Sequence, residues 1–229
     1  MTREPREAFE KMITSHMEEI QALSAMVEES IIKSVKTLVD QDLETAKTVY
    51  DLDQVINEKR YEIEQNTLVT VATQQPMASD LRKLSSVIDL AGELERIGDY
   101  AKGIARITMR IGKQPLLKNL DKIPEMAEIT AVMLKRAVQA FIDLDEPAAM
   151  EIVDQDDQID DRYNALYQEL LDLMIADRKN IDQATFLLWV AHNLERAADR
   201  VTNICERVVF TTSGKLVEFD RSDDELEAF

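Results

Sequence analysis

Turn-forming residues are scarce in this chain. Its 229 residues include only 5 Gly and 5 Pro, although apolar residues make up 45% of the total. β-Sandwiches and β-barrels need frequent turns, which glycine and proline most often form. A chain with ample core material but few turns is therefore expected to fold into long helices rather than into one of these all-β classes.

Basic residues and cysteine are also in short supply. The chain has 27 Lys and Arg against 45 Asp and Glu, which gives a formal net charge of −18. Such a surface repels nucleic-acid phosphate and anionic lipid, so we expect no nucleic-acid partner and favour cations and basic protein surfaces. The single cysteine, Cys205, cannot form an internal disulfide, which is typical of a protein of the reducing cytosol.

Long apolar runs are missing as well. The densest apolar stretch, residues 186–191, is far shorter than the roughly 20 residues that a membrane-spanning helix needs. The residues that follow Met1 also lack the apolar core of a signal peptide. We therefore expect a cytoplasmic protein without direct membrane insertion.

Helical periodicity dominates what remains. Apolar residues recur at spacings of three and four from Phe9 to Leu38, and the same spacing returns in the segments that follow. Interruptions predict six helices, which end near Leu38, Val71, Ile111, Phe141, Ala176 and Phe210. The fifth helix is expected to be continuous from the turn at residues 143–147 to Ala176.

The chain also repeats a polar motif. Residues 95–104 read E-R-I-G-D-Y-A-K-G-I and residues 195–204 read E-R-A-A-D-R-V-T-N-I, which share the pattern E-R-x-x-D-x-x-x-[G/N]-I. Likewise, Asp53-x-x-Ile56-Asn57 matches Asp156-x-x-Ile159-Asp160. The two halves of the chain are therefore interpreted as copies of one unit.

Together these patterns predict an all-α fold of two tandem three-helix bundles related by internal duplication. The first bundle is assigned to residues 1–113 and the second to residues 114–215, followed by an acidic tail at 216–229. Long helices joined by short turns are expected to be antiparallel neighbours. Within the tail, residues 222–227 are expected to be frayed.

The repeated motif places two acids on one helical face. A spacing of four aligns Glu95 with Asp99 and Glu195 with Asp199, and like charges at this spacing repel each other. One explanation is that Arg96 and Arg196 neutralise the acids as ion pairs. Because a solvated face tolerates many residue types, the survival of the same acids in both halves also suggests a more specific role.

The helix before each motif carries an acid at an unusual position. Asp53 and Asp156 interrupt the apolar seams of the second and fifth predicted helices. A carboxylate near a core seam is costly unless it is paired, hydrogen-bonded or bound to metal. Antiparallel pairing would bring Asp53 and Asn57 to the first motif, and Asp156 and Asp160 to the second.

Clusters of oxygen ligands suit hard cations. The sequence therefore predicts binding of divalent or trivalent metal ions (iron, Mn, Mg or Zn) by Asp53, Glu95, Asp99, Asp156, Asp160, Glu195 and Asp199. Pure ion pairing of these acids with arginine is the alternative. No organic cofactor is expected, because the chain has no Gly-rich phosphate cradle.

A carboxylate-bridged metalloenzyme or metal store is a further hypothesis. Di-iron bundles use Glu-x-x-His on two helices, whereas this chain has only His16 and His192, and His192-Asn-Leu-Glu195 reads in reverse order. His192 is accordingly interpreted as a helix-surface residue. Since no set of nucleophile and base is recognisable either, we expect no catalytic residues.

These motifs, repeated in register within two three-helix halves, resemble the PhoU family. The resemblance implies paired three-helix bundles, usually as a homodimer, in a cytoplasmic regulator that is not an enzyme. It implies negative regulation of phosphate uptake and of phosphate-starvation signalling. The implied partners are the nucleotide-binding subunit of the phosphate ABC transporter and a sensor histidine kinase.

The resemblance also bears on the acidic residues. Some family members bind metal clusters at [Glu/Asp]-x-x-x-Asp motifs, which correspond here to the acids of the two repeats. Asn57 departs from that pattern, because the matching residue of the second half is Asp160. The resemblance therefore implies fewer or weaker ligands in the first half.

Overall fold

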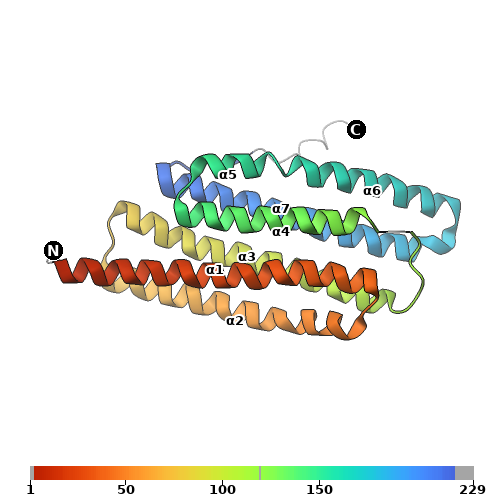
Figure 1. Cartoon of the computed structure of the whole chain (residues 1–229), viewed down its shortest axis with the longest axis horizontal. Helices are drawn as coiled ribbons and strands as arrows, with labels where there is room; N and C mark the ends of the chain where they lie inside the picture. Colours follow the sequence, from red (N-terminus) through yellow and green to blue (C-terminus); the bar gives the residue numbers. More distant parts are fainter. Residues whose placement is uncertain (1–2, 119, 220–229) are drawn as a thin grey trace.

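The first half of the chain folds into three long antiparallel helices. The computed structural model describes residues 3–118 and 120–219, and its first helices are α1 (Arg3–Asp40), α2 (Leu43–Gln74) and α3 (Ala78–Ile111) (Figure 1). The Asp42 side chain accepts hydrogen bonds from the backbone N–H groups of Glu44 and Thr45, which fixes the start of α2. At the other end, Gln75 adopts a left-handed conformation with φ of 48°. These two corners allow each helix to fold back on the one before.

The second half repeats this path with one interruption. Its elements are α4 (Lys122–Asp143), α5 (Glu146–Val153), α6 (Asp157–Ala176), the short 3-10 helix η1 (Arg178–Asn180) and α7 (Ile181–Ser213). The expectation of one continuous fifth helix is therefore wrong. The amides of Gln155 and Asp156 bond the carbonyls three residues before them, at 3.0 Å each, which makes a tight turn between α5 and α6.

The all-α prediction is confirmed. The described ranges contain no strand, and the helices follow the predicted order, with the fifth one split. No helix in the part that the structure describes is long and apolar enough to cross a membrane. The expectation for residues 222–227 concerns residues outside the described ones.

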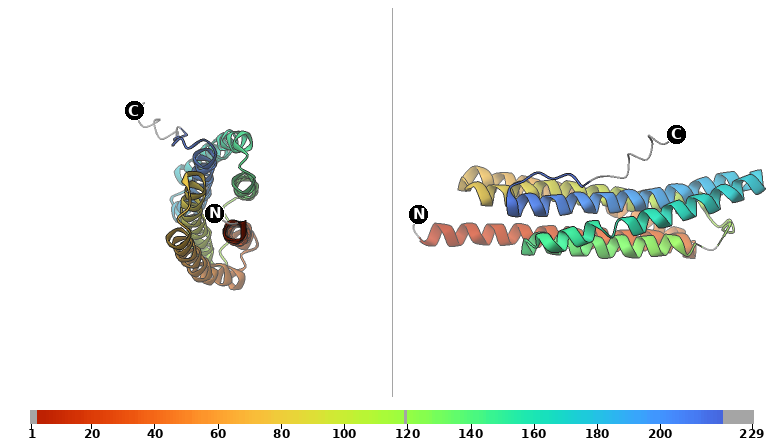
Figure 2. Two further views of the ribbon diagram at one scale, coloured as in Figure 1. Left: turned by 90° about the vertical axis from the view of Figure 1, so that its left-hand side faces the viewer. Right: turned by 90° about the horizontal axis from the view of Figure 1, so that it is seen from above.

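The two three-helix units share one apolar core. A single buried cluster includes Ile31 of α1, Leu94 of α3, Phe141 of α4 and Val201 of α7, each with 0% of its surface exposed. The motif helices α3 and α7 pack side by side along their length, and α1 packs beside α4 (Figure 2). The arrangement places the two repeated motifs on adjacent helices at the centre of the molecule. The boundaries at 113 and 215 stay a prediction.

Candidate functional site

The first group of acids gathers around a lysine. We name Asp53, Glu95 and Asp99 the first acidic cluster. The Asp53 side chain is buried, with 6% exposure, and its Oδ2 accepts a hydrogen bond from Lys102 Nζ at 2.6 Å. The same Nζ lies 3.7 Å from Asp99 Oδ1, and Asn57 Nδ2 donates to Asp53 Oδ2 at 3.3 Å. The helix pairing predicted from the sequence therefore does bring these residues together.

Burial and crowding of negative charge disfavour ionisation of the acids in the first cluster. Burial, together with the negative charge of Asp53, raises the pKa of Asp99. Burial also raises the pKa of Glu95, with a further contribution from Asp99. The hydrogen bond to Asp53 raises the pKa of Lys102 in turn, so this lysine remains an ammonium ion at neutral pH.

The cation at this cluster differs from the one suggested by the repeat. Arg96 lies at the surface, and the Arg196 guanidinium is stacked over the Tyr100 ring, 5.2 Å from its centroid. Sequence reasoning missed Lys102. Lys102 could have been identified from the sequence, because it follows Asp99 by three residues and so lies on the same helical face.

Within the described residues, the second group of acids contains no lysine in the position of Lys102, where the chain has Thr202. We name Asp156, Asp160, Glu195 and Asp199 the second acidic cluster. Burial, followed by the charges of Asp199, Asp160 and Glu195 in that order, raises the pKa of Asp156 to about 7. The second half therefore also brings its predicted acids together, and the charges of the other three disfavour ionisation of Asp156.

Asp156 occupies a position that sequence periodicity did not predict. It lies in the turn that separates α5 from α6, not on a continuous helical seam. Its Oδ1 is buried and has no hydrogen-bond partner. An unsatisfied buried carboxylate oxygen is unfavourable, and it is the observation in this cluster that fits a missing cation best.

Two further side chains border the second cluster. His192 Nδ1 lies 3.1 Å from Glu195 Oε2, and the imidazole is half exposed, as expected for a helix-surface residue. Cys205 is fully buried, and burial, with the charge of Asp156, raises the pKa of its thiol to about 12. Because only a thiolate binds metal well, Cys205 adds no ligand to this cluster at neutral pH.

The fit to a metal ion differs between the clusters. Among the residues that the structure describes, no three His, Cys, Asp or Glu side chains are arranged to hold an ion. Binding would require the carboxylates of a cluster to draw together. Each cluster has a buried carboxylate oxygen without a hydrogen-bond partner, Oδ1 of Asp53 in the first and Oδ1 of Asp156 in the second. The first cluster fits a metal poorly because an ammonium already lies among its acids, whereas the second offers more carboxylates. The predicted ligand set itself stays a prediction.

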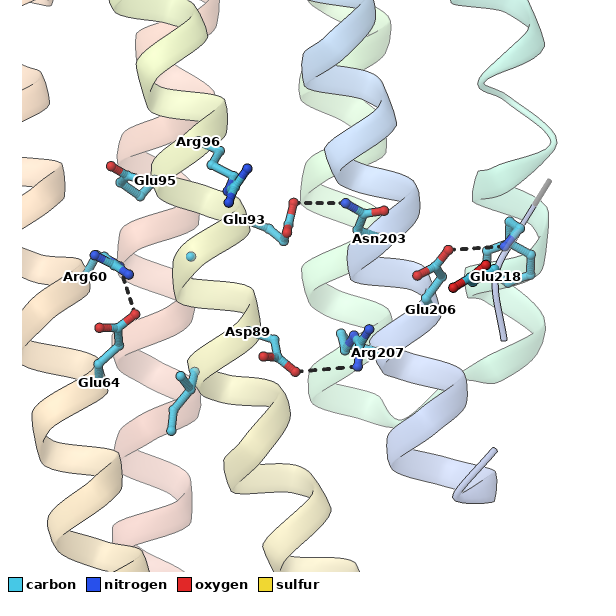
Figure 3. A pocket seen from close by; sticks show the side chains of 13 residues that line it. Arg60, Glu64, Asp89, Glu93, Glu95, Arg96, Asn203, Glu206, Arg207 and Glu218 are labelled. Atoms are coloured by element: carbon cyan, nitrogen blue, oxygen red, sulfur yellow. Dashed lines mark hydrogen bonds and ion pairs between the residues drawn. The ribbon is translucent and has the colours of Figure 1, made fainter. Parts of the chain in front are cut away.

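A large polar groove begins beside the first cluster (Figure 3). Its volume is about 810 Å³, and it is lined by three arginines, six acids and four other residues: Arg60, Arg96, Arg207, Glu64, Asp89, Glu93, Glu95, Glu206, Glu218, Ile88, Gly92, Asn203 and Phe219. We name it the α2–α3–α7 groove. The motif residues Glu95 and Arg96 are part of its wall.

Contacts across the groove join the two halves of the chain. Asn203 Nδ2 donates to Glu93 Oε2 at 3.1 Å, and Arg207 lies 3.6 Å from Asp89. The segment after α7 closes one end, where the Phe219 amide donates to Glu206 Oε1 at 3.1 Å and its ring packs against the core. This groove could not be predicted from the sequence, because its residues come from three helices and a terminal segment.

The chain closely matches proteins of known kind over nearly its whole length. The sequence model of the PhoU domain matches residues 20–108 and 123–208. The "Phosphate-specific transport system accessory protein PhoU homolog" of Rhizobium meliloti (strain 1021) is 31% identical over 220 residues, which are 96% of this chain and 93% of the relative. The homolog of the same name from Synechocystis sp. is 34% identical over 211 residues, or 92% and 93% of the two chains.

Solved structures agree with these sequence matches. The phosphate transport system regulatory protein PhoU from Streptococcus pneumoniae superimposes with a TM-score of 0.86 at 30% identity, covering 92% of this chain and 100% of that one. PhoU from Pseudomonas aeruginosa gives 0.86 at 27% identity, with 90% and 100% coverage. The chain therefore belongs to the PhoU domain family, whose members are accessory and regulatory proteins rather than enzymes.

Proposed function

We propose that this protein is a cytoplasmic regulator of phosphate homeostasis that restrains phosphate uptake and phosphate-starvation signalling when phosphate is plentiful. The observation that carries the proposal is the family membership across both repeats, with relatives named as accessory proteins of phosphate-specific transport. The matched relatives are covered almost completely, so the likeness extends to the whole of their length.

The proposed mechanism is direct protein contact. The partners are the nucleotide-binding subunit of the phosphate ABC transporter and the sensor histidine kinase, with the regulator acting as a homodimer. A net charge of −18 favours basic surfaces on these partners. The α2–α3–α7 groove, in which acids outnumber arginines two to one, offers such surfaces an acidic face.

Deletion of the gene in its source organism tests the physiological role. We expect the deletion strain to express alkaline phosphatase and to take up phosphate in high-phosphate medium, where the parent strain does neither strongly. Complementation with the intact gene should restore both. Unchanged phosphatase expression and uptake in the deletion strain would contradict the proposed role.

A binding experiment with purified proteins tests the proposed contact. The transporter subunit should bind this protein with an affinity that falls as salt rises, because the contact joins opposite charges. Glu64→Gln combined with Asp89→Asn, both in the groove wall, should weaken binding. The matched control is Glu29→Gln with Asp51→Asn, which removes the same charge from exposed positions outside the groove. Equal binding by both variants would exclude the groove as the contact face.

We also propose that the second acidic cluster binds a hard metal ion such as Mn²⁺ or iron. The unpaired buried Oδ1 of Asp156 and the nearby carboxylates of Asp160, Glu195 and Asp199 support this assignment. Metal content measured after purification and after Mn²⁺ addition tests it, with Asp156→Asn plus Asp199→Asn as the variant that should lose the ion. A variant with undiminished metal content would refute this ligand assignment.

A further inference from the structure

The two halves differ at one residue that bears directly on metal binding. In the repeated motifs, Lys102 and Thr202 occupy the same position, seven residues after the glutamate. Lys102 extends from α3 toward the first acidic cluster. The Thr202 hydroxyl instead donates to the backbone carbonyl of Asp199 at 2.8 Å, so it contributes no charge to the second cluster.

The Lys102 ammonium is positioned as a counter-ion. It lies 2.6 Å from Asp53 Oδ2 and 3.7 Å from Asp99 Oδ1, so one cation contacts acids from both α2 and α3. The Tyr50 ring, 5.6 Å from Nζ, adds a favourable cation–π contact. Asn57 adds a hydrogen bond to the same carboxylate oxygen, with its amide nitrogen 3.3 Å from Oδ2, whereas the buried Oδ1 has no hydrogen-bond partner.

The charge of Lys102 disfavours the binding of a second cation at the first acidic cluster. Asp53 is the most buried acid of the cluster, and a buried carboxylate is best compensated by one close, hydrogen-bonded partner. A metal ion bound to Asp53 and Asp99 would have to displace the ammonium from between them. It would then face a positive charge that is tethered nearby.

We propose that Lys102 is the built-in counter-cation of the first acidic cluster and thereby decides that this half of the protein binds no metal ion. Hard divalent cations are then confined to the second half, where threonine replaces the lysine. The statement about the second half rests on the metal site in the proposed function, whereas the statement about the first half does not.

The decisive experiment isolates the first cluster. Asp156→Asn and Asp199→Asn together disable the second cluster, and Lys102→Thr is then added to give the first half the residue of the second. Equilibrium dialysis against Mn²⁺, with bound ion counted by elemental analysis, should give no ion for the parent double variant and about one ion per chain once Lys102→Thr is present. Lys33→Thr, which removes an exposed lysine of α1, is the matched control and should gain none.

Thermal unfolding gives a readout independent of ion counting. In EDTA, Lys102→Thr should lower the Tm because Asp53 loses its partner, whereas Lys102→Arg should preserve it. In the background of Asp156→Asn and Asp199→Asn, which disables the second cluster, Mn²⁺ should then raise the Tm of the threonine variant and leave that of the arginine variant unchanged. If Lys102→Thr fails to fold, Lys102→Gln, which keeps most of the side-chain length without the charge, takes its place in both measurements.

Two results would overturn the proposal. One is binding of Mn²⁺ by the first half while Lys102 is present, and the other is no gain of Mn²⁺ after the charge is removed. A separate titration of the wild-type protein reports on the second cluster. Absence of binding there would contradict the proposed metal site of the second half without affecting the result for Lys102.

Discussion

Replacement of Asp156 by asparagine should stabilise the metal-free protein at neutral and alkaline pH. Asparagine retains the shape of the side chain but carries no charge, so it removes the repulsion from Asp199, Asp160 and Glu195. It also removes the need to bury an ionised carboxylate in the turn before α6. If the Asp156 carboxylate served to stabilise the fold, its replacement would instead lower the stability.

The magnitude follows from the pKa of Asp156. That pKa is about 7 in the folded protein against an ordinary value of 3.8. Since one pKa unit corresponds to about 1.4 kcal/mol, ionisation at high pH costs the folded state at most about 4 kcal/mol. Neighbouring acids share this effect and solvent screens part of it, so we expect a gain of about 2–4 kcal/mol, or roughly 5–15 °C in Tm for a chain of this size.

The pH dependence has a definite sign. Below pH 3.8 Asp156 is protonated in both the folded and the unfolded chain, so wild type and variant should be equally stable. As the pH rises from about 4 to about 7, the unfolded chain releases this proton first, which favours unfolding of the wild type. Above about pH 7 the folded wild type has also lost this proton. The difference in the free energy of unfolding between wild type and Asp156→Asn should therefore be largest there.

Urea unfolding in EDTA at pH 4, 6 and 8 measures this difference. Asp161→Asn, which removes a charge from an exposed position on α6, should change the free energy of unfolding by less than about 0.5 kcal/mol. If Asp156→Asn proves less stable than wild type at pH 8, the ionised carboxylate makes favourable contacts that outweigh repulsion. The reasoning about the second cluster would then be wrong.

Four further predictions concern the fold. Gly92→Ala should raise the free energy of unfolding by up to about 1 kcal/mol through helix propensity, because nothing lies within 4 Å of the added Cβ. Gly98→Ala should be less stable than Gly92→Ala, because its Cβ would lie 3.1 Å from Cδ1 of buried Ile56, and equal urea midpoints would contradict this. Phe141→Ala should cost about 3–5 kcal/mol in urea unfolding, since its fully buried ring leaves a cavity; a loss below about 1 kcal/mol would show that the core collapses around it. Asp145→Ala should cost about 1 kcal/mol because Asp145 accepts from the Ala148 amide at the start of α5, and an unchanged midpoint would show that this cap is dispensable.

The sequence was sufficient to predict the helices and the acids that meet. Periodicity of three and four residues locates the long helices because each buries one face. It failed between α5 and α6, where Ile152 and Ile159 are both fully buried. Their spacing of seven keeps the seam in phase across the turn, so the apolar pattern contains no trace of the break.

The electrostatic details of the clusters were less predictable. Four-residue spacing identified the paired acids, but it could not choose between Arg96 and Lys102 as their cation, because that choice depends on how α2 lies against α3. The approach of Cys205 to Asp156 depends in the same way on the packing of α7 against the turn. Contacts between helices therefore determine which cation and which thiol approach the acids, and residue spacing within a single helix does not reveal them.

The break after α5 has a further consequence, because it creates a new helix start beside the second acidic cluster. Asp156 directly precedes α6, and Asp157 and Asp160 lie in its first turn. Aligned peptide dipoles place about half a unit of positive charge at a helix N-terminus, which attracts nearby carboxylates. Each half thus places positive charge beside its acids. In the first half this charge is the Lys102 ammonium ion, and in the second it is the N-terminal end of the α6 macrodipole.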